Sequence, residues 1–305
     1  MLKHADQNAP SEPRHCASAD PAVPQLMPLR ADHLPQAAGL SSALAWPYRE
    51  LDWRFAFELG AGLAVEVEGQ LVGTALWWPQ GESHATVGMI IVSSTLQGKG
   101  IGRALMDSLL QHTGERTLML NSTQEGLALY TRLGFVAHGR IHQHQALLEH
   151  TSHFVAQGAP VRFMQIEDQQ SVRQLDRAAT GRDRSALLSH LFEIGSILVV
   201  DHGDGVSAYG CVREWGRGVV IGPVVASGPE AVPDAKALIA ALAEAHQGRF
   251  IRIDVTEDSG LSPWLSESGL PCVGHATPMV RTTHAPPGSA ETDARLLALS
   301  NQSIG

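Results

Sequence analysis

The sequence predicts two tandem α/β domains, and three observations support this. The chain has 305 residues, more than a typical single domain, and 44% of them are hydrophobic, so each half can bury a normal core. Apolar strands alternate with amphipathic helices from about Leu26 onward. The same order recurs in the second half. Val92 and Met119 are 27 positions apart, and the matching strand centres Val225 and Ile253 are 28 apart, which indicates a duplication.

The first domain is predicted over residues 25–150, after a segment at 1–24 whose Pro, Ala, Ser and Asp content is typical of disorder. Glycines end its helices, and Glu68-Gly69-Gln70 forms a hairpin turn. The third strand is mostly apolar and is expected in the centre of the sheet. The predicted elements are helices at 31–44 and 48–60, strands at 63–68, 71–77 and 86–93, a helix at 101–112, a strand at 117–120, a helix at 125–133 and a strand at 135–145.

The second domain is predicted over residues 160–282, followed by a flexible tail at 283–305 that contains Pro286-Pro287-Gly288-Ser289. It begins with two helices and a three-strand meander, as the first domain does. The predicted elements are helices at 171–179 and 185–195, strands at 197–200, 206–214 and 219–225, a helix at 231–246, a strand at 250–255 and a helix at 261–268.

Composition excludes several classes of protein. The net charge is −9 and acidic residues outnumber basic ones in both halves, so nucleic acid is not an expected partner. Three widely spaced cysteines, Cys16, Cys211 and Cys272, argue against a disulfide framework and favour a reducing cytoplasm. The N-terminus has no apolar signal-peptide core, and no apolar run reaches 18 residues. We therefore expect neither export nor a membrane span.

A glycine-rich turn follows the third strand and leads into a helix, from Gln97 to Gly102. Backbone N–H groups of such a turn can point at one anion, and the helix adds the positive end of its dipole. A Walker loop is excluded because Lys99 is followed by Gly100 rather than Ser or Thr. A Rossmann fingerprint is excluded because the glycine spacing is wrong and Asn121 stands where an acidic residue is needed.

The run Gln97-Gly98-Lys99-Gly100-Ile101-Gly102 resembles the pyrophosphate loop of the GNAT acyltransferases. Leu129-Tyr130-Thr131-Arg132-Leu133-Gly134-Phe135 resembles the helix-and-strand signature of that family, and Gly88-Met89-Ile90-Ile91-Val92 matches the strand before the loop. The likeness is to a bacterial group with a second, divergent GNAT-like domain, strongly over 27–145 and weakly over 160–281. It implies an α/β fold of the α+β type, each domain having a mixed, mostly antiparallel sheet flanked by helices.

The resemblance also implies site residues and a co-substrate, acetyl-coenzyme A. Backbone groups of the strand ending at Val92 would bind the pantetheine arm as an added strand does. Tyr130 would be the catalytic acid that protonates the leaving thiolate. Thr123 stands where many members have Asn, which puts the pantetheine contact of that helix in doubt; it can instead cap the helix. The implied cofactor-binding residues are Ile90, Ile91, Val92, Gln97, Gly98, Lys99, Gly100, Ile101, Gly102, Arg103, Asn121 and Thr123.

Other residues have weaker claims to a role. Glu82 and His84 are candidates for the general base, with ordinary loop residues as the alternative. Aromatic residues at Trp46, Tyr48, Trp53, Trp77 and Trp78 would shape an acceptor site or pack in the core. A histidine cluster suggests a metal, at His138, His142, His144, His150 and His153. We expect no metal, because no cysteine lies near in the sequence and the resembled family needs none; His142 and His144 would line the acceptor pocket or pack.

The second domain lacks this machinery. Ser227-Gly228-Pro229-Glu230 replaces the glycine loop, Pro229 removes a donor amide, and Trp264 and Leu265 stand where a phenol is needed. Arg184, Arg217 or Asp254 would shape the acceptor site or form ion pairs within the fold. The expected function is direct transfer of an acetyl group from acetyl-CoA to a primary amine of an unidentified, small acceptor. The alternative is a non-catalytic acyl-CoA-binding or sensing protein. A homodimer is compatible with the sequence.

Overall fold

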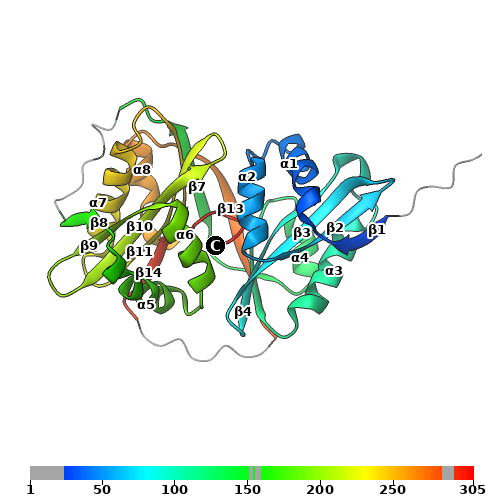
Figure 1. Ribbon diagram of the computed structural model, residues 1–305, viewed down its shortest axis with the longest axis horizontal. Helices are drawn as coiled ribbons and strands as arrows, with labels where there is room; N and C mark the ends of the chain where they lie inside the picture. Colours follow the sequence, from blue (N-terminus) through cyan, green and yellow to red (C-terminus); the bar gives the residue numbers. More distant parts are fainter. Residues whose placement is uncertain (1–23, 151–153, 155–158, 284–291) are drawn as a thin grey trace, which may run out of the picture.

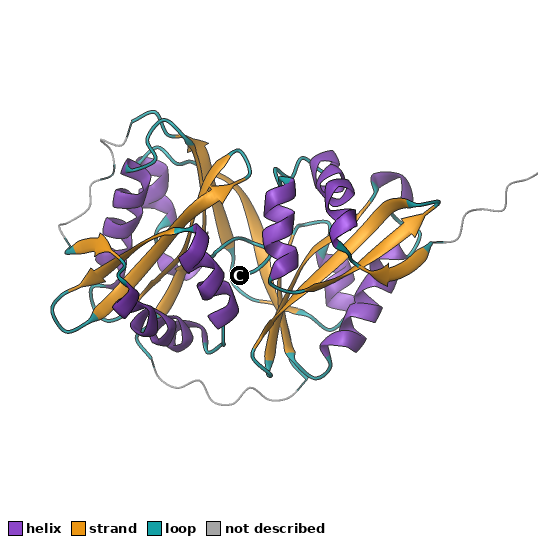
Figure 2. Ribbon diagram, in the orientation of Figure 1, coloured by secondary structure: helices purple, strands orange, loops and turns teal. Residues whose placement is uncertain are grey.

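The computed structural model describes residues 24–150, 154, 159–283 and 292–305. Two halves lie side by side (Figure 1), and in each half helices flank a set of strands (Figure 2). The first half comprises β1 (Gln25–Pro28), α1 (Leu34–Ala43), α2 (Glu50–Glu58), β2 (Ala61–Val67), β3 (Gln70–Gln80), β4 (His84–Val92), α3 (Ile101–Thr113), β5 (Thr117–Ser122), α4 (Leu127–Arg132), β6 (Val136–Ala137) and β7 (Ile141–Leu147).

The second half repeats this order, which confirms the predicted duplication. Its β9, β10 and β11 form the predicted meander. Its elements are β8 (Val161–Phe163), α5 (Gln169–Thr180), α6 (Ser185–Ile194), β9 (Ser196–Asp201), β10 (Val206–Trp215), β11 (Gly218–Ala226), α7 (Ala231–Glu244), β12 (Phe250–Thr256), α8 (Ser262–Glu267), β13 (Cys272–Arg281) and β14 (Arg295–Ala298).

The two halves exchange a strand. In the first half, β13 pairs with β5 and β6, although it comes from the end of the second repeat. In the second half, β7 pairs with β12 along its whole length, although it belongs to the first repeat. Because β7 and β13 also pair with each other, all strands join into one mixed, mostly antiparallel 14-stranded sheet. Figure 1 shows β7 and β13 crossing side by side between the halves. The sequence predicted a single strand at 135–145; the chain instead turns at Gly139, with a φ of +61°, between β6 and β7.

The central parallel pair of each half opens partway along. Strands β4 and β5 form only three residue pairs, from His84 with Thr117 to Thr86 with Met119. Strands β11 and β12 also form three, from Val219 with Ile251 to Ile221 with Ile253. Beyond these three pairs the strands separate. In the second half β14 enters this gap and pairs with both β11 and β12. In the first half no strand of the described chain enters it.

The hydrophobic core covers both faces of the sheet. Helix α3 packs against β2, β3 and β4 of the first half through Ile101, Leu105 and Leu109, the apolar positions predicted for one helix face. Helix α7 packs against the second half through Leu238 and Leu242. The opposite faces of both halves share one cluster, formed by α1, α2, α5 and α6. Among the described residues, no helix combines the length and apolar character that crossing a bilayer needs.

The segment predicted as a flexible tail is largely ordered. Residues 284–291 lie outside the described part, as do residues 1–23, for which disorder was predicted. Within 292–305, β14 pairs in the sheet, and Leu299, Ser300, Asn301 and Ile304 are buried. The apolar run at 296–299 is short and its partners are far away in the sequence, so no local pattern predicted this strand.

Candidate active site

A cavity of about 820 Å³ lies between the two halves, at the open end of the β4–β5 pair. One wall consists of β4, from Val87 to Val92, and of the loop and helix α3 that follow it. Strand β5, helix α4 and the exchanged strands β7 and β13 form the other. The cavity can thus receive a ligand along the free edge of β4.

A bulge in β4 shapes this edge. Thr74 of β3 pairs with Ile91, but the next pair is Leu76 with Gly88, so the register shifts between them. Met89 lies within the bulge, with a φ of +50°, and its carbonyl accepts a hydrogen bond of 2.8 Å from the Thr74 hydroxyl. A bulge re-aims the backbone of a strand. Here it bends β4 away from β5, where the cavity opens.

The glycine turn presents unused amides at the start of α3. Gly98 and Gly100 have φ values of +76° and +85°, where a side chain would be strained, and the space around both is open. The first helical hydrogen bond runs from Ala104 N to Gly100 O at 2.9 Å. Within the described chain, no acceptor takes the six amides from Gly98 to Arg103. These donors and the helix dipole favour an anion.

Most residues predicted to bind the cofactor line the cavity, and three do not. Lys99, Gly100 and Arg103 are absent from its wall. The Arg103 guanidinium instead pairs with Asp107 one turn along α3, at 2.7 Å, with both side chains about half exposed. The predicted residues that line the cavity are Ile90, Ile91, Val92, Gln97, Gly98, Ile101, Gly102, Asn121 and Thr123.

Tyr130 of α4 also lines the cavity, with 8% of its surface exposed. Its ring packs edge-on against Phe135, and Gly126 leaves room for it, since a Cβ there would lie 2.8 Å from the ring. Its hydroxyl has no hydrogen-bond partner in the described chain. Burial raises the pKa of Tyr130 to about 12, so the phenol holds its proton at neutral pH. The site thus places a protonated phenol in a cavity that opens beside the glycine turn.

Family comparison agrees with this geometry in both halves. The model of the acetyltransferase (GNAT) family matches residues 29–135. A second model, described as an acetyltransferase (GNAT) domain, matches residues 172–292. The chain belongs to the GNAT acetyltransferases. The matches bear out the tandem arrangement, and the protein is an acyltransferase of this type.

Known relatives share the whole architecture. The uncharacterized N-acetyltransferase YitH of Bacillus subtilis is 27% identical over 255 residues, which span 81% of this chain and 88% of the relative. A putative acetyltransferase from Pyrococcus horikoshii has a TM-score of 0.76 at 18% identity, covering 96% of this chain and 99% of that one. A tandem GNAT protein from the clavulanic acid biosynthesis pathway has a TM-score of 0.62 at 17% identity, covering 87% and 100%. The two structures confirm the fold.

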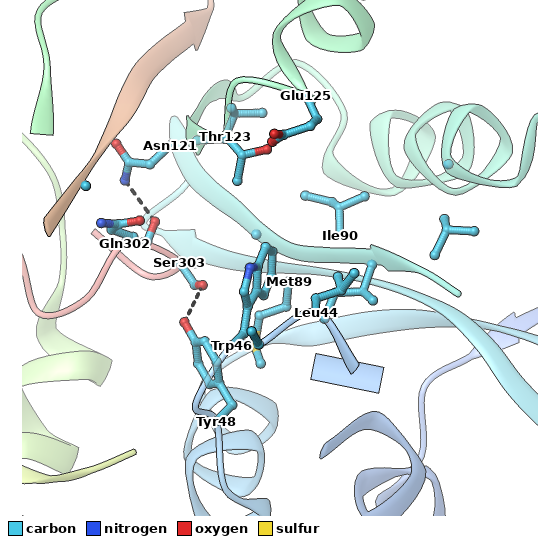
Figure 3. A pocket seen from close by; sticks show the side chains of 18 of the residues that line it. Leu44, Trp46, Tyr48, Met89, Ile90, Asn121, Thr123, Glu125, Gln302 and Ser303 are labelled. Carbon is cyan, nitrogen blue, oxygen red and sulfur yellow. Dashed lines mark hydrogen bonds between the residues drawn. The ribbon is translucent and has the colours of Figure 1, made fainter. Parts of the chain in front are cut away.

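The C-terminal segment completes the GNAT cavity, and sequence reasoning missed it (Figure 3). The Asn121 side-chain amide donates to Gln302 O at 2.8 Å, and the hydroxyls of Tyr48 and Ser303 are 2.8 Å apart. Gly88 admits the segment, because a Cβ there would lie 2.9 Å from Ser303 O. No local pattern could have found these residues, since Tyr48 and Ser303 are 255 positions apart.

Other candidate side chains lie away from the cavity. Glu82 and His84 are near the start of β4 and do not line it. Of the five aromatic residues, Trp46 and Tyr48 line it; the other three do not. Trp53 and Trp78 are buried, and Trp77 stacks on His112.

The histidines are divided among several environments. His144 is buried and bonded to Leu270 O at 2.7 Å and to the Ser262 hydroxyl at 2.9 Å, so it packs rather than lining the cavity. His142 pairs with His275 across β7 and β13, and His275 lines the cavity. His138 and His150 are exposed, and His153 lies outside the described residues.

Thr123 does not take its predicted capping role, whereas Arg184 and Asp254 form ion pairs within the fold, the alternative to a role in the acceptor site. Helix α4 starts after Gly126, so Thr123 is not its cap. Arg184 pairs with Asp176 and Asp254 with Arg252, both within the fold. Arg217 lines the cavity and lies over the Phe250 ring at 5.5 Å.

The second half is closed where the first is open. Strand β14 fills the gap between β11 and β12. At the start of α7, buried Asp234 accepts hydrogen bonds of 3.0 Å from the Ser207 hydroxyl and the His202 ring. A carboxylate at this helix end disfavours a second anion. This arrangement leaves no open strand edge between β11 and β12 that a ligand could pair with.

Proposed function

We propose that the first half binds acetyl-CoA and transfers its acetyl group directly to a primary amine of a small acceptor. The observation that carries this is the set of six amides at the start of α3 that have no acceptor among the described residues, next to a cavity lined by the free edge of β4. Those amides suit the diphosphate of the coenzyme. The β4 edge suits the pantetheine amides, which would pair with it as an added strand.

The reaction needs no covalent enzyme intermediate. The amine nitrogen attacks the thioester carbonyl carbon, the C–S bond breaks, and the coenzyme leaves as a thiolate. Tyr130 lines the cavity with a free, protonated hydroxyl and would give its proton to the sulfur. The amine loses its proton to water or to a base that the acceptor complex supplies. This transfer requires no metal.

The acceptor would enter from the side of the cavity formed by the second half and by Gln302 and Ser303. Gln143 of β7, Arg217 of the β10–β11 turn and Arg252 of β12 line the same space. We place the protein in the cytoplasm, where its thiols would stay reduced; Cys211 and Cys272 form no disulfide. A homodimer remains compatible with this arrangement, and nucleic acid is not proposed as a partner.

Calorimetric titration with acetyl-CoA, followed by a thiol-release screen against amino acids, polyamines and other amines, tests the proposal. We expect one coenzyme per chain and thiol release with at least one amine class. Stoichiometric binding without thiol release across the panel would favour the alternative, an acyl-CoA-binding or sensing protein. Absence of binding would refute both.

A further inference from the structure

The exchange of β7 and β13 brings one histidine together with a cysteine and a second histidine that are distant from it in the sequence. His142 lies on β7, and Cys272 and His275 lie on β13. One ligand atom from each residue lies within 4.8 Å of the other two. The expectation of no metal depended on finding no cysteine near the histidines in the chain; the fold supplies one from 130 positions away.

Strand register explains the cluster. His142 and His275 are direct partners in the β7–β13 ladder, so their side chains leave the same face of the sheet, with ring centroids 4.9 Å apart. The register shifts between Cys272 and Gly274, and this irregularity turns Cys272 toward the same place. The Cys272 sulfur lies 3.9 Å from His275 Nδ1.

The spacing suits one ion of the zinc class. A tetrahedral Zn²⁺ with bonds of about 2.3 Å to sulfur and 2.05 Å to nitrogen places those two atoms about 3.6 Å apart. The observed 3.9 Å needs only a small side-chain movement. Two imidazoles and a thiolate are the donor types that Zn²⁺, Co²⁺ and Cu⁺ prefer over Mg²⁺ or Ca²⁺.

The exposure of the three side chains also suits a metal. His142 and Cys272 are half-buried, and His275 is exposed toward the cavity between the halves. The site is therefore shielded on the sheet side and accessible from the cavity.

We propose that His142, Cys272 and His275 bind one transition-metal ion of the zinc class, which ties the exchanged strands β7 and β13 together at the edge of the cavity. Three protein ligands leave a fourth position for water or another small ligand. The site is separate from the proposed acetyl transfer and stands whether or not that transfer occurs.

Cobalt titration of the full chain tests the proposal without an activity assay. We expect one Co²⁺ per chain, with an intense near-ultraviolet thiolate-to-cobalt band and tetrahedral visible bands that Zn²⁺ abolishes by displacement. Bound Zn²⁺ should also raise the melting temperature of the apo-protein, because the ion binds the folded state only.

Variants locate the ion. Cys272→Ser should abolish the thiolate band. His142→Ala and His275→Ala should each weaken the affinity for Co²⁺ by more than ~10- to 100-fold, which is the cost of losing a residue that only supports a metal ligand. Cys16→Ser and His138→Ala are matched controls that should bind as the wild type does. Circular dichroism spectra check that each variant is folded.

Two outcomes would overturn the proposal. One is the absence of stoichiometric metal binding by the folded wild type. The other is binding that survives in Cys272→Ser with the thiolate band intact but disappears in Cys16→Ser, which would place the ion on the N-terminal residues.

Discussion

Tyr130 differs from a surface tyrosine in two respects: it is buried, and its hydroxyl has no hydrogen-bond partner in the part of the chain that the structure describes. Both follow from its place in α4, where Gly126 and Phe135 make a slot for the ring. The hydroxyl is left facing the cavity, where a leaving thiolate would need a proton.

Replacing Tyr130 by Phe should lower kcat by about 100-fold or more, as expected for loss of a general acid. Acetyl-CoA affinity should change little, because the phenol would contact only the sulfur end of the coenzyme. Stopped-flow thiol release and calorimetric titration measure the two quantities separately. Unchanged kcat in the variant would remove Tyr130 from the mechanism.

The pH profile offers a second test of the same residue. Because burial raises the pKa of Tyr130 to about 12, the phenol stays protonated where an ordinary tyrosine, near pH 10, begins to ionise. The wild-type kcat should therefore show no phenol-linked decline up to about pH 10. A decline of the wild-type kcat near pH 10 that Tyr130→Phe does not show would contradict the raised pKa of Tyr130.

A buried ion pair stabilises the second half. Asp176 and Arg184 are 2.5 Å apart and almost fully buried, and the Tyr209 hydroxyl also bonds Asp176. Burial alone would raise the pKa of Asp176, but Arg184 and the hydrogen bonds outweigh it, and the pKa is lowered. The pair therefore stabilises the fold fully at pH values above the pKa of an ordinary aspartate. This contribution is lost as the pH falls through the lowered pKa of Asp176.

We expect Asp176→Asn to cost about 3–5 kcal/mol in the free energy of unfolding, because it leaves the Arg184 charge buried and uncompensated. Urea denaturation at neutral pH measures it. Glu50→Gln, which breaks the exposed Glu50–Arg54 pair on α2, is the control and should cost about 0.5 kcal/mol or less. Equal losses of unfolding free energy in the two variants would show that the buried ion pair matters no more than the exposed one.

At the scale of elements, the glycine turn and α3 act together. The turn needs positive φ values, and the helix needs its first amides free, so any side chain at Gly100 affects both. Gly100→Asp should weaken acetyl-CoA binding at least tenfold, because the carboxylate would face the diphosphate at a distance where like charges repel by about 1–4 kcal/mol.

Gly114→Asp is the matched control. Gly114 ends the same helix, also has a positive φ and also faces open space, but it lies at the opposite end of α3 from the loop. We expect a similar loss of stability in both variants and a loss of affinity only in Gly100→Asp. Equal affinities would count against the loop as the diphosphate site.

At the scale of the molecule, the strand exchange makes the halves depend on each other. Without β13, the outer edge of β5 is unpaired, and without β12, β7 has no sheet to join on that side. The residues 25–150 that the sequence groups as one domain therefore lack a strand of their own sheet. Unpaired edges expose backbone groups and favour aggregation.

We expect a chain of residues 25–150 to show no cooperative thermal transition, whereas the full chain unfolds with coincident signals from Trp53 and Trp215, which lie in different halves. Calorimetry and near-ultraviolet circular dichroism of both chains measure this. A cooperative transition of the short chain near the full chain's melting temperature would show that the exchange is dispensable.

The sequence alone determined the features that depend on neighbours in the chain. The order of helices and strands, the duplication, the turn at Gly98 and Gly100 and the position of Tyr130 follow from periodicity, glycine and motif spacing, which act within a few residues. Comparison confirmed the family that these motifs indicated.

Only the tertiary structure decided the features that depend on pairing between distant segments. The exchange of β7 and β13, the filling of the β11–β12 gap by β14, the placement of Ser303 against Tyr48 and the meeting of His142 with Cys272 each join residues more than 40 positions apart. Hydrogen-bonded pairing accepts any strand of suitable register, so it leaves no local pattern that would identify the partner.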